Sequence, residues 1–271
     1  MIRTDCHAHS CFSSDCSTPV ELMIEQAILF SFDTFYLTDH MDFDFPDTEE
    51  GLDFLFSPSD YFKTLSGLKK KYEDTIKIMV GIELGLKTTA SVKKQIGKLL
   101  NEYSFDLIIG STHLVDNLDP YHSSYWEGRS EKEGLAHFFR ATLENTKAYP
   151  NVNVLGHLDY AIRYSPSKGI NFSFEAYQSI LEEILTFIIA NDIALEVNTA
   201  GFKHGLNKPN PNPDIIKRYL DLGGSMISIG SDGHVPSYYG YRFEETRTLL
   251  LDLGVTHYTT FEKGVARKFL L

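Results

Sequence analysis

The sequence predicts an α/β fold of repeated strand–helix units, arranged as a (β/α) barrel or as a doubly wound sheet. Short apolar runs rich in β-branched residues recur along the chain, and several of them are nearly continuous. Such runs are typical of strands that are buried on both faces of a parallel sheet. We expect seven strands, at residues 2–6, 34–37, 76–82, 106–109, 152–155, 193–197 and 226–229.

Helical patterns lie between and after these runs. In one of them, Ser57 and Pro58 supply a capping residue followed by a proline in the first turn. In another, Ile180, Ile184 and Ile188 recur at the spacing of one helix face. We expect seven helices, at residues 19–30, 57–72, 88–103, 130–149, 174–191, 213–222 and 243–253.

Composition and charge narrow the range of functions. A length of 271 residues fits one large domain or two small ones, and 42% hydrophobic residues supply a core. The formal net charge is −12 and the basic residues are scattered, whereas nucleic-acid binders display a basic patch. No stretch approaches the roughly 20 apolar residues of a membrane span. We therefore expect a small-molecule ligand, with no nucleic-acid partner and no membrane partner.

The first residues and the cysteines indicate an intracellular setting. Residues 1–5 lack the apolar region of a signal peptide, so we expect a cytoplasmic protein. The three cysteines, Cys6, Cys11 and Cys16, form no Cys-x-x-Cys pair, and their odd count does not fit a disulfide framework. We interpret them as small buried or inert thiols.

Reactive side chains follow the predicted strands. In both candidate folds the active site gathers at the carboxyl ends of the strands. Seven of the ten histidines lie at such positions, if His204 in the loop after the sixth strand is included. His122, His137 and His257 do not fit this pattern, and we expect no metal role for them. The side chains at the strand ends are His7, His9, His40, Glu83, His113, His157, Glu196, Asn198, Asp232 and His234.

These residue types predict a metal site. Neutral imidazoles and carboxylates are the ligands of zinc, manganese and iron. His7 and His9 are two positions apart, so on a strand they point to the same side. Six histidines together with Asp15, Glu83 and Asp232 exceed what one four-coordinate ion can use. We expect two or three divalent ions, with a carboxylate such as Glu83 bridging; purely structural histidines are the alternative interpretation.

Three further aspartates each neighbour a predicted ligand. They are Asp5, Asp39 and Asp159. Carboxylates commonly orient ligating histidines, so a supporting role is at least as well founded for them as direct ligation.

The chain resembles the PHP family (polymerase and histidinol phosphatase) in order and spacing of motifs along essentially its whole length. The motifs are Asp5-x-His7-x-His9, Thr38-Asp39-His40, Gly81-Ile82-Glu83, Ser111-Thr112-His113, Gly156-His157 and Ser231-Asp232-Gly233-His234. Further segments are similar to the histidinol-phosphatase branch of that family: residues 39–46, 113–116, 119–121 and 196–199.

This resemblance implies a distorted (β/α)7 barrel, similar to a TIM barrel, formed by one domain over residues 1–271. It also implies three metal ions, with His7, His9, Glu83 and Asp232 on the first. Glu83, His113 and His157 would hold the second, and Asp15, His40 and His234 the third. The family can use histidine where this chain has Asp15, which leaves the occupancy and identity of the third metal open.

The implied activity is hydrolysis of a phosphomonoester, L-histidinol phosphate in histidine biosynthesis, by a hydroxide that bridges the metals. Arg163 is the first candidate for binding the phosphate, because a guanidinium binds two oxygens at once. Lys203 and His204 are the next candidates, and Asn198 is expected to orient the substrate. The general acid is left open between Asp42, His204 and a metal-bound water.

Two long loops are expected to receive the positive end of that substrate. Residues 41–56 supply Asp42, Asp44, Asp47 and several phenylalanines, and residues 116–129 add Tyr121, Tyr125 and Trp126. Both loops exceed the usual connection of about 2–6 residues.

Three alternatives stay open at this point. One is a PHP-family phosphatase for phosphotyrosine or another small phosphate ester. Another is a hydrolase of C–N bonds, which a carbamylated lysine at a strand end would favour, and no lysine stands there. The last is a metal-binding scaffold without activity.

Overall fold

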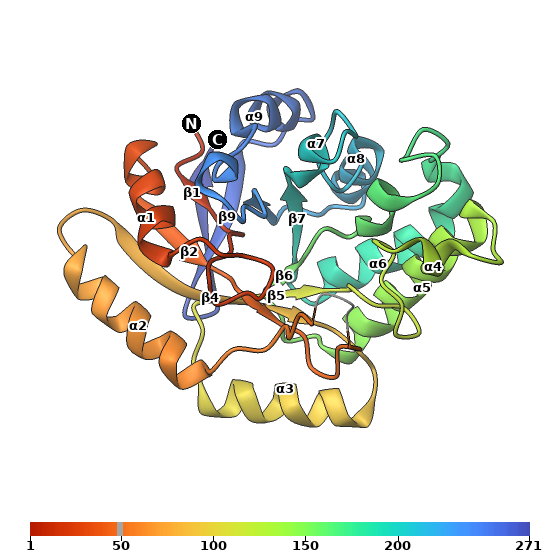
Figure 1. Ribbon diagram of the computed structural model, residues 1–271. Coiled ribbons are helices and arrows are strands. Elements are labelled where there is room, and N and C mark those ends of the chain that lie inside the picture. The colour runs from red at the N-terminus through yellow and green to blue at the C-terminus, as the bar shows by residue number, and fades with distance from the viewer. Residues whose placement is uncertain (48–50) are drawn as a thin grey trace.

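The computed structural model describes residues 1–47 and 51–271, and it confirms the α/β barrel (Figure 1). Seven parallel strands form one sheet in the order β1-β2-β4-β5-β6-β7-β8, and β3 pairs with β4 beside β2. The strands are β1 Thr4–Asp5, β2 Thr34–Leu37, β3 His40–Met41, β4 Lys77–Gly85, β5 Leu107–Ser111, β6 Val154–Leu155, β7 Ala194–Asn198 and β8 Ile227–Gly230.

Backbone hydrogen bonds nearly close the sheet between its first and last strands. The N–H of Cys6 donates to the carbonyl of Ile229 at 3.0 Å, and the N–H of Asp232 donates to the carbonyl of His7 at 2.8 Å. Because of this closure, the residues that follow β1 lie next to the residues that follow β8.

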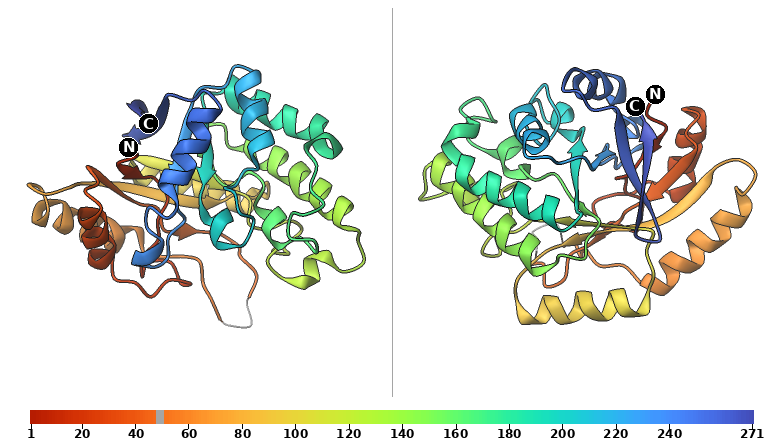
Figure 2. Two further views of the ribbon diagram at one scale, coloured as in Figure 1. Left: turned by 90° about the horizontal axis from the view of Figure 1, so that it is seen from above. Right: turned by 180° about the vertical axis from the view of Figure 1, so that it is seen from behind.

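Helices surround the barrel, and all seven predicted helices are present (Figures 1 and 2). Ser57 caps its helix by accepting the N–H of Asp60, and Ser130 forms a reciprocal capping box with Glu133. The helices are α1 Val20–Leu29, α2 Pro58–Lys71, α3 Ala90–Glu102, α5 Glu131–Ala148, α6 Gln178–Ala190, α8 Pro213–Asp221 and α9 Phe243–Asp252. The predicted helix 174–191 begins as a 3-10 turn, Phe174–Tyr177, before α6.

Short elements in the loops were not predicted, because three to five residues carry no readable periodicity. They are α4 Ser123–Trp126, α7 Ala200–Lys203 and the 3-10 helices Tyr160–Tyr164 and Pro236–Tyr238. Strands beside the site also differ from the prediction. β3 was missed, and β4 continues beyond residue 82, so Glu83 lies inside a strand instead of after it.

A hairpin of β9 (His257–Glu262) and β10 (Val265–Leu270) closes the amino-terminal end of the barrel, as the right panel of Figure 2 shows. Phe261 packs there with Tyr36, whose hydroxyl donates to the Phe261 carbonyl. The N–H of Gly264 donates to the carbonyl of Asp106 at 3.0 Å. The site must therefore form at the other end. The small inner core consists of Cys6, Tyr36, Met79, Leu107, Ile109, Val154, Ala194 and Phe261.

The cysteines are free, with Cys6 and Cys16 buried and Cys11 exposed. Among the helices of the described residues, none combines the length and apolar character needed to cross a membrane.

Candidate metal centre and pocket

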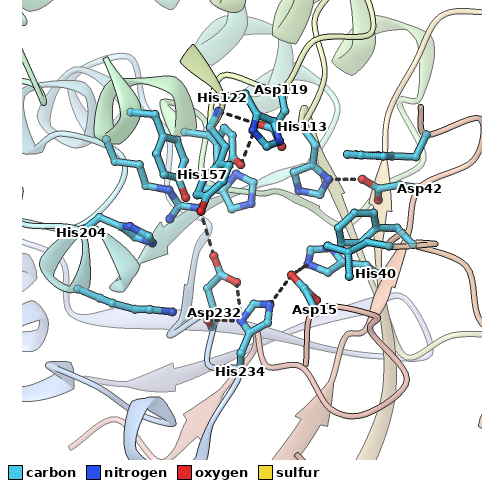
Figure 3. Close-up of a pocket in the computed structure, with 18 residues that line it drawn as sticks. Asp15, His40, Asp42, His113, Asp119, His122, His157, His204, Asp232 and His234 are labelled. Carbon is cyan, nitrogen blue, oxygen red and sulfur yellow. Dashed lines mark hydrogen bonds and ion pairs between the residues drawn. The ribbon is translucent and has the colours of Figure 1, made fainter. Parts of the chain in front are cut away.

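The predicted ligands converge at the carboxyl ends of the strands, around a cavity of about 470 Å³ (Figure 3). His7, His9 and Glu83 are fully buried beside the cavity. The remaining six predicted ligands line it, namely Asp15, His40, His113, His157, Asp232 and His234.

Glu83 lies at the centre of the imidazoles. Its Oε1 is 3.0 Å from Nε2 of His157 and 3.2 Å from Nε2 of His113. Its Oε2 is 3.1 Å from Nε2 of His7 and 2.9 Å from Nδ1 of His40. The parallel register of β3 and β4 places His40 directly beside Glu83. One carboxylate therefore faces two separate sets of histidines, as a bridging ligand must.

Asp232 faces the histidines that follow β1. Its Oδ1 is 3.2 Å from Nε2 of His9 and 3.9 Å from Nε2 of His7. Asp232 comes just after β8, where its backbone adopts a left-handed φ of 54°. The closure of the barrel between β1 and β8 thus brings the three side chains together.

A third group lies next to these two. Oδ2 of Asp15 is 3.2 Å from Nε2 of His234 and 3.7 Å from Nε2 of His40. The ring of His9 stacks against the rings of both His40 and His234, with centroids 4.2 Å away in each case. The loop before α1 therefore delivers Asp15 to the cluster.

The donor atoms of this cluster fit divalent metal ions. Nε2 of His7, Nε2 of His9 and Nδ1 of His40 are buried and make no hydrogen bond of normal geometry within residues 1–47 and 51–271. Each nevertheless lies 2.9–3.5 Å from Oε2 of Glu83. Buried polar atoms normally find a partner, and imidazoles with carboxylates are the donor set of zinc, manganese and iron. Four triads bring their ligand atoms within 4.8 Å: His9–His40–His234, His7–His9–Asp232, His40–Asp42–His113 and Glu83–His113–His157.

The charges of the cluster support the same interpretation. Burial would raise the pKa of Glu83, but His7, His40 and His113 hold that pKa well below its usual value. Burial likewise opposes ionisation of Asp232, and the neighbouring histidines and Arg163 keep its pKa low. Both carboxylates therefore stay ionised. The pKa values of His7, His40 and His113 are raised in return, and metal binding would displace the protons that these three rings hold.

The three supporting aspartates hold backbone segments and do not contact imidazoles in the described chain. Asp5 accepts the N–H groups of His7 at 3.2 Å and Ser231 at 2.9 Å. Asp39 accepts hydrogen bonds from the N–H and hydroxyl groups of Ser10 and Ser13. Asp159 accepts from Nδ2 of Asn210 at 2.6 Å and from the N–H of Asn212 at 2.8 Å.

Two other carboxylates contact the predicted ligands directly. Oδ2 of Asp42 lies 2.6 Å from Nδ1 of His113, and Oε1 of Glu196 lies 2.6 Å from Nδ1 of His7. Sequence reasoning named Asp42 as a candidate acid and gave Glu196 no role. The position of Glu196 at the end of a predicted strand could have indicated a role at the site.

Arg163 lies in the 3-10 helix after β6 and is only 5% exposed. Its guanidinium lies over the rings of Tyr160 at 4.5 Å and Tyr164 at 5.2 Å, and its Nη2 is 3.6 Å from Oδ2 of Asp232. Nε and Nη1 have no hydrogen-bond partner in the described part of the chain. A buried cation with free donors therefore faces the pocket beside the cluster.

The other predicted substrate residues differ in their placement. Lys203 and His204 line the pocket, and Lys203 lies over the ring of Tyr238 at 4.8 Å. Burial, together with Arg163 and Lys203, lowers the pKa of His204 to about 4. Asn198 does not line the pocket: its amide donates to Glu196 at 3.1 Å and accepts the N–H of Ala200 at 2.9 Å. It caps a turn, and its contact with substrate stays a prediction.

The predicted loops contribute part of the pocket wall. Residues 41–56 supply Asp42, Phe45, Leu52 and Phe54, although residues 48–50 of that loop lie outside the described chain. Residues 116–129 supply Asp119, Tyr121 and His122. Asp44, Asp47, Tyr125 and Trp126 do not line the pocket, contrary to expectation. Tyr125 is fully buried and donates its hydroxyl to the carbonyl of Gly134.

A parallel sheet nearly closed into a barrel, with a histidine and carboxylate cluster at its carboxyl end, defines the class of metal-binding α/β barrels. The chain belongs to the PHP family, since the sequence model of the PHP domain matches residues 5–200. This match confirms the resemblance drawn from the motifs.

Relatives of known name cover nearly the whole chain. The histidinol-phosphatase of Lactococcus lactis subsp. lactis (strain IL1403) is 29% identical over 96% of this chain and 95% of its own. A protein of Clostridium acetobutylicum named "Probable histidinol-phosphatase" is 30% identical over 89% of both chains. The crystal structure of the Lactococcus lactis histidinol phosphate phosphatase, complexed with Zn, L-histidinol and phosphate, matches with a TM-score of 0.86. That match has 27% identity and covers 98% of each chain.

Proposed function

We propose that this chain is a metal-dependent phosphomonoesterase that hydrolyses L-histidinol phosphate to L-histidinol and phosphate, a step of histidine biosynthesis in the cytoplasm. The observation that carries the proposal is the position of Glu83, whose two oxygens face separate histidine sets beside a pocket with a free guanidinium. The relatives named above support the choice of substrate.

We infer that the cluster holds two or three divalent ions, zinc as in the Lactococcus lactis structure, or manganese or iron. His7, His9, Glu83 and Asp232 would hold one ion, and Glu83, His113 and His157 a second. Asp15, His40 and His234 would hold the third. When bound, such ions lower the pKa of a bound water toward neutrality and offset the charge of the phosphoryl oxygens.

Arg163 would bind the phosphate in this scheme. Its Nε and Nη1 have no partner in the described chain and can donate to phosphoryl oxygens of the substrate. Stacking on Tyr160 and Tyr164 fixes the plane of the group before substrate arrives. The guanidinium would therefore stabilise charge that develops as the P–O bond breaks. Lys203 at the pocket edge would add a more distant positive charge.

Asp119 would receive the positive end of the substrate. Among the aspartates that line the pocket in the described chain, it alone makes no ion pair with a histidine. Its Oδ1 accepts the N–H of Tyr121 at 2.8 Å and the hydroxyl of Tyr160 at 3.1 Å, which fixes the carboxylate. A cavity of about 470 Å³ falls within the range of small-molecule sites.

The two side chains considered for the general acid suit that role poorly. Asp42 is engaged with His113, and the pKa of His204, about 4, leaves its imidazole neutral near pH 7. We therefore place neither residue on the path of the leaving-group proton. Asp42 instead orients a ligand, and His204 forms part of the pocket wall.

Phosphate release from L-histidinol phosphate, phosphotyrosine and an aryl phosphate tests the proposal, with protein loaded with zinc or manganese and again after chelation. Metal-dependent preference for L-histidinol phosphate is the expected result. Turnover of the other two esters alone would leave a metal phosphatase with another substrate, as the more distant "Probable phosphatase" relatives at 23% identity suggest. Absence of turnover in every arm would reject the enzymatic proposal.

A further inference from the structure

Glu196 lies in the middle of β7, and neither of its carboxylate oxygens is free. Oε1 is 2.6 Å from Nδ1 of His7. Oε2 accepts the backbone N–H of His157 at 2.6 Å and Nδ2–H of Asn198 at 3.1 Å. The side chain is 1% exposed, so water does not compete for these contacts.

We propose that Glu196 is a positioning residue that couples two metal sites by orienting one ligand of each. This inference rests on the proposed function, because it takes His7 and His157 as ligands of different ions. The carboxylate would not itself bind metal, since it belongs to none of the possible ligand groups in the described chain.

The contact with His7 fixes the tautomer of its ring. A carboxylate oxygen accepts hydrogen bonds, so Nδ1 of His7 carries a proton, and in the neutral ring Nε2 then presents its lone pair. Nε2 is the atom that lies 3.1 Å from Oε2 of Glu83. A carboxylate behind a histidine in this way also raises the basicity of the ligating nitrogen.

The contact with His157 acts through the main chain. His157 follows β6, and its N–H points across to β7, where Glu196 receives it. Anchoring this N–H sets the direction in which the side chain leaves the backbone, and Nε2 then lies 3.0 Å from Oε1 of Glu83. Each of the two histidines is therefore held at two points. Glu196 contacts Nδ1 of His7 and the backbone N–H of His157, and Glu83 faces Nε2 of both rings.

Gly230 makes room for this arrangement. A Cβ atom at residue 230 would lie 2.3 Å from Cβ of His7 and 2.7 Å from Oε1 of Glu196. At Gly230, β8 carries no side chain where His7, which follows β1, meets Glu196 of β7. The glycine in β8 thus leaves room for the hydrogen bond between His7 and Glu196. This hydrogen bond would not be needed if the side chain of Glu196 only filled space.

Glu196→Gln is the first test, because glutamine keeps the shape and replaces one acceptor oxygen by an N–H donor. The single amide oxygen can accept a hydrogen bond from only one of the two donors, Nδ1–H of His7 or the N–H of His157. The other donor then faces the NH₂ group, which cannot accept it. Asp106→Asn is the matched control, since the Asp106 carboxylate also accepts two donors, the N–H groups of Val80 and Lys263, but lies at the opposite end of the barrel. Zinc affinity is measured on the full chain by competition with a chelator, and stoichiometry by elemental analysis.

Glu196→Gln should weaken zinc binding about 10–100-fold at two sites together, while Asp106→Asn keeps the wild-type affinities. Wild-type affinities in Glu196→Gln would overturn the inference, and a loss at one site only would overturn the coupling. An equal loss in both variants would also overturn it. A wild-type protein that binds no zinc would instead reject the proposed function.

A measurement on wild-type protein covers the case in which Glu196→Gln does not fold. Long-range ¹H–¹⁵N correlation of histidine-labelled, zinc-loaded protein reports which ring nitrogen carries the proton, with His7 identified by its loss in His7→Asn. We expect His7 to be protonated at Nδ1 and metal-bound at Nε2. The opposite tautomer would overturn the role of Glu196.

Discussion

Nδ1 of His113 lies 2.6 Å from Oδ2 of Asp42, and Nε2 of the same ring points at Oε1 of Glu83 from 3.2 Å. The aspartate therefore holds the ring by one nitrogen and leaves the other for the cluster. A carboxylate–histidine–metal arrangement of this kind orients the ligand and tunes its basicity. Under the proposed function Asp42 thus supports His113 and is not the general acid, for which the sequence made it one of the candidates.

Asp42→Asn should lower metal affinity about 10–100-fold while the protein stays folded, because His113 loses the charged acceptor that orients it. Zinc titration against a chelator measures this change. Asp44→Asn is the matched control, since Asp44 lies two residues away and binds Gln95 at the exposed surface. Loss of turnover in Asp42→Asn at unchanged metal affinity would restore the acid role of Asp42.

Gly85→Ala should reproduce the metal-binding defect of Asp42→Asn without touching a charged group. A Cβ at residue 85 would lie 2.4 Å from Cγ of Asp42, so the buried carboxylate must move away from His113. Gly97→Ala is the control, because nothing lies within 4 Å of its added Cβ in helix α3. That control should gain up to about 1 kcal/mol of stability from helix propensity. Wild-type zinc affinity in Gly85→Ala would contradict the positioning role.

Arg163→Ala should reduce turnover about a thousandfold with metal content intact, the scale expected for a lost charge clamp. Arg163→Lys should recover only part of the loss, because an ammonium cannot bind two oxygens in a fixed plane. Steady-state rates and elemental analysis of the same samples measure both effects. Arg129→Ala is the control, since Arg129 also lies over a tyrosine, at 4.7 Å from Tyr125, but does not line the pocket. Near-normal turnover in Arg163→Ala would reject its assignment.

His204 should make folding pH-dependent in a defined window. Burial and its cationic neighbours lower the pKa of the ring from 6.5 to about 4 in the folded chain. Between these values the unfolded chain binds more protons, so folding becomes less favourable as pH falls from about 6.5 to 4. His204→Gln should flatten this part of the stability curve, as measured by denaturant titration at several pH values. His257→Gln, an exposed ring on β9, is the control, and parallel curves for wild type and His204→Gln would contradict the prediction.

The barrel and the ligand cluster were predictable because each signal is local. An apolar run such as 152–155 ends at His157, and parallel strands place their carboxyl ends on one side of the sheet. The order of runs and helices then suffices to bring His7, Glu83 and Asp232 together, although their separations in sequence are large.

The supporting contacts and the closing hairpin were not predictable for a physical reason. Glu196 and His7 are 189 positions apart, and only the three-dimensional path of β7 and β1 shows that their atoms meet. Every residue of β10 is exposed, so the strand lacks the alternation of apolar and polar residues by which half-buried strands are found. The sequence likewise does not reveal that the amide of Asn198 donates to Glu196.

Asp119→Asn should affect the affinity for one kind of substrate only. The carboxylate would pair with the cationic end of L-histidinol phosphate, and a hydrogen bond to a charged group contributes about 1.5–3 kcal/mol, or roughly 10–100-fold in KM. An aryl phosphate has no cationic end, so its kinetic constants should stay at wild-type values. His122→Gln is a control from the same wall of the pocket. Equal losses on both substrates would mean that Asp119 merely shapes the loop through Tyr121 and Tyr160, and the proposed recognition of the amine would be wrong.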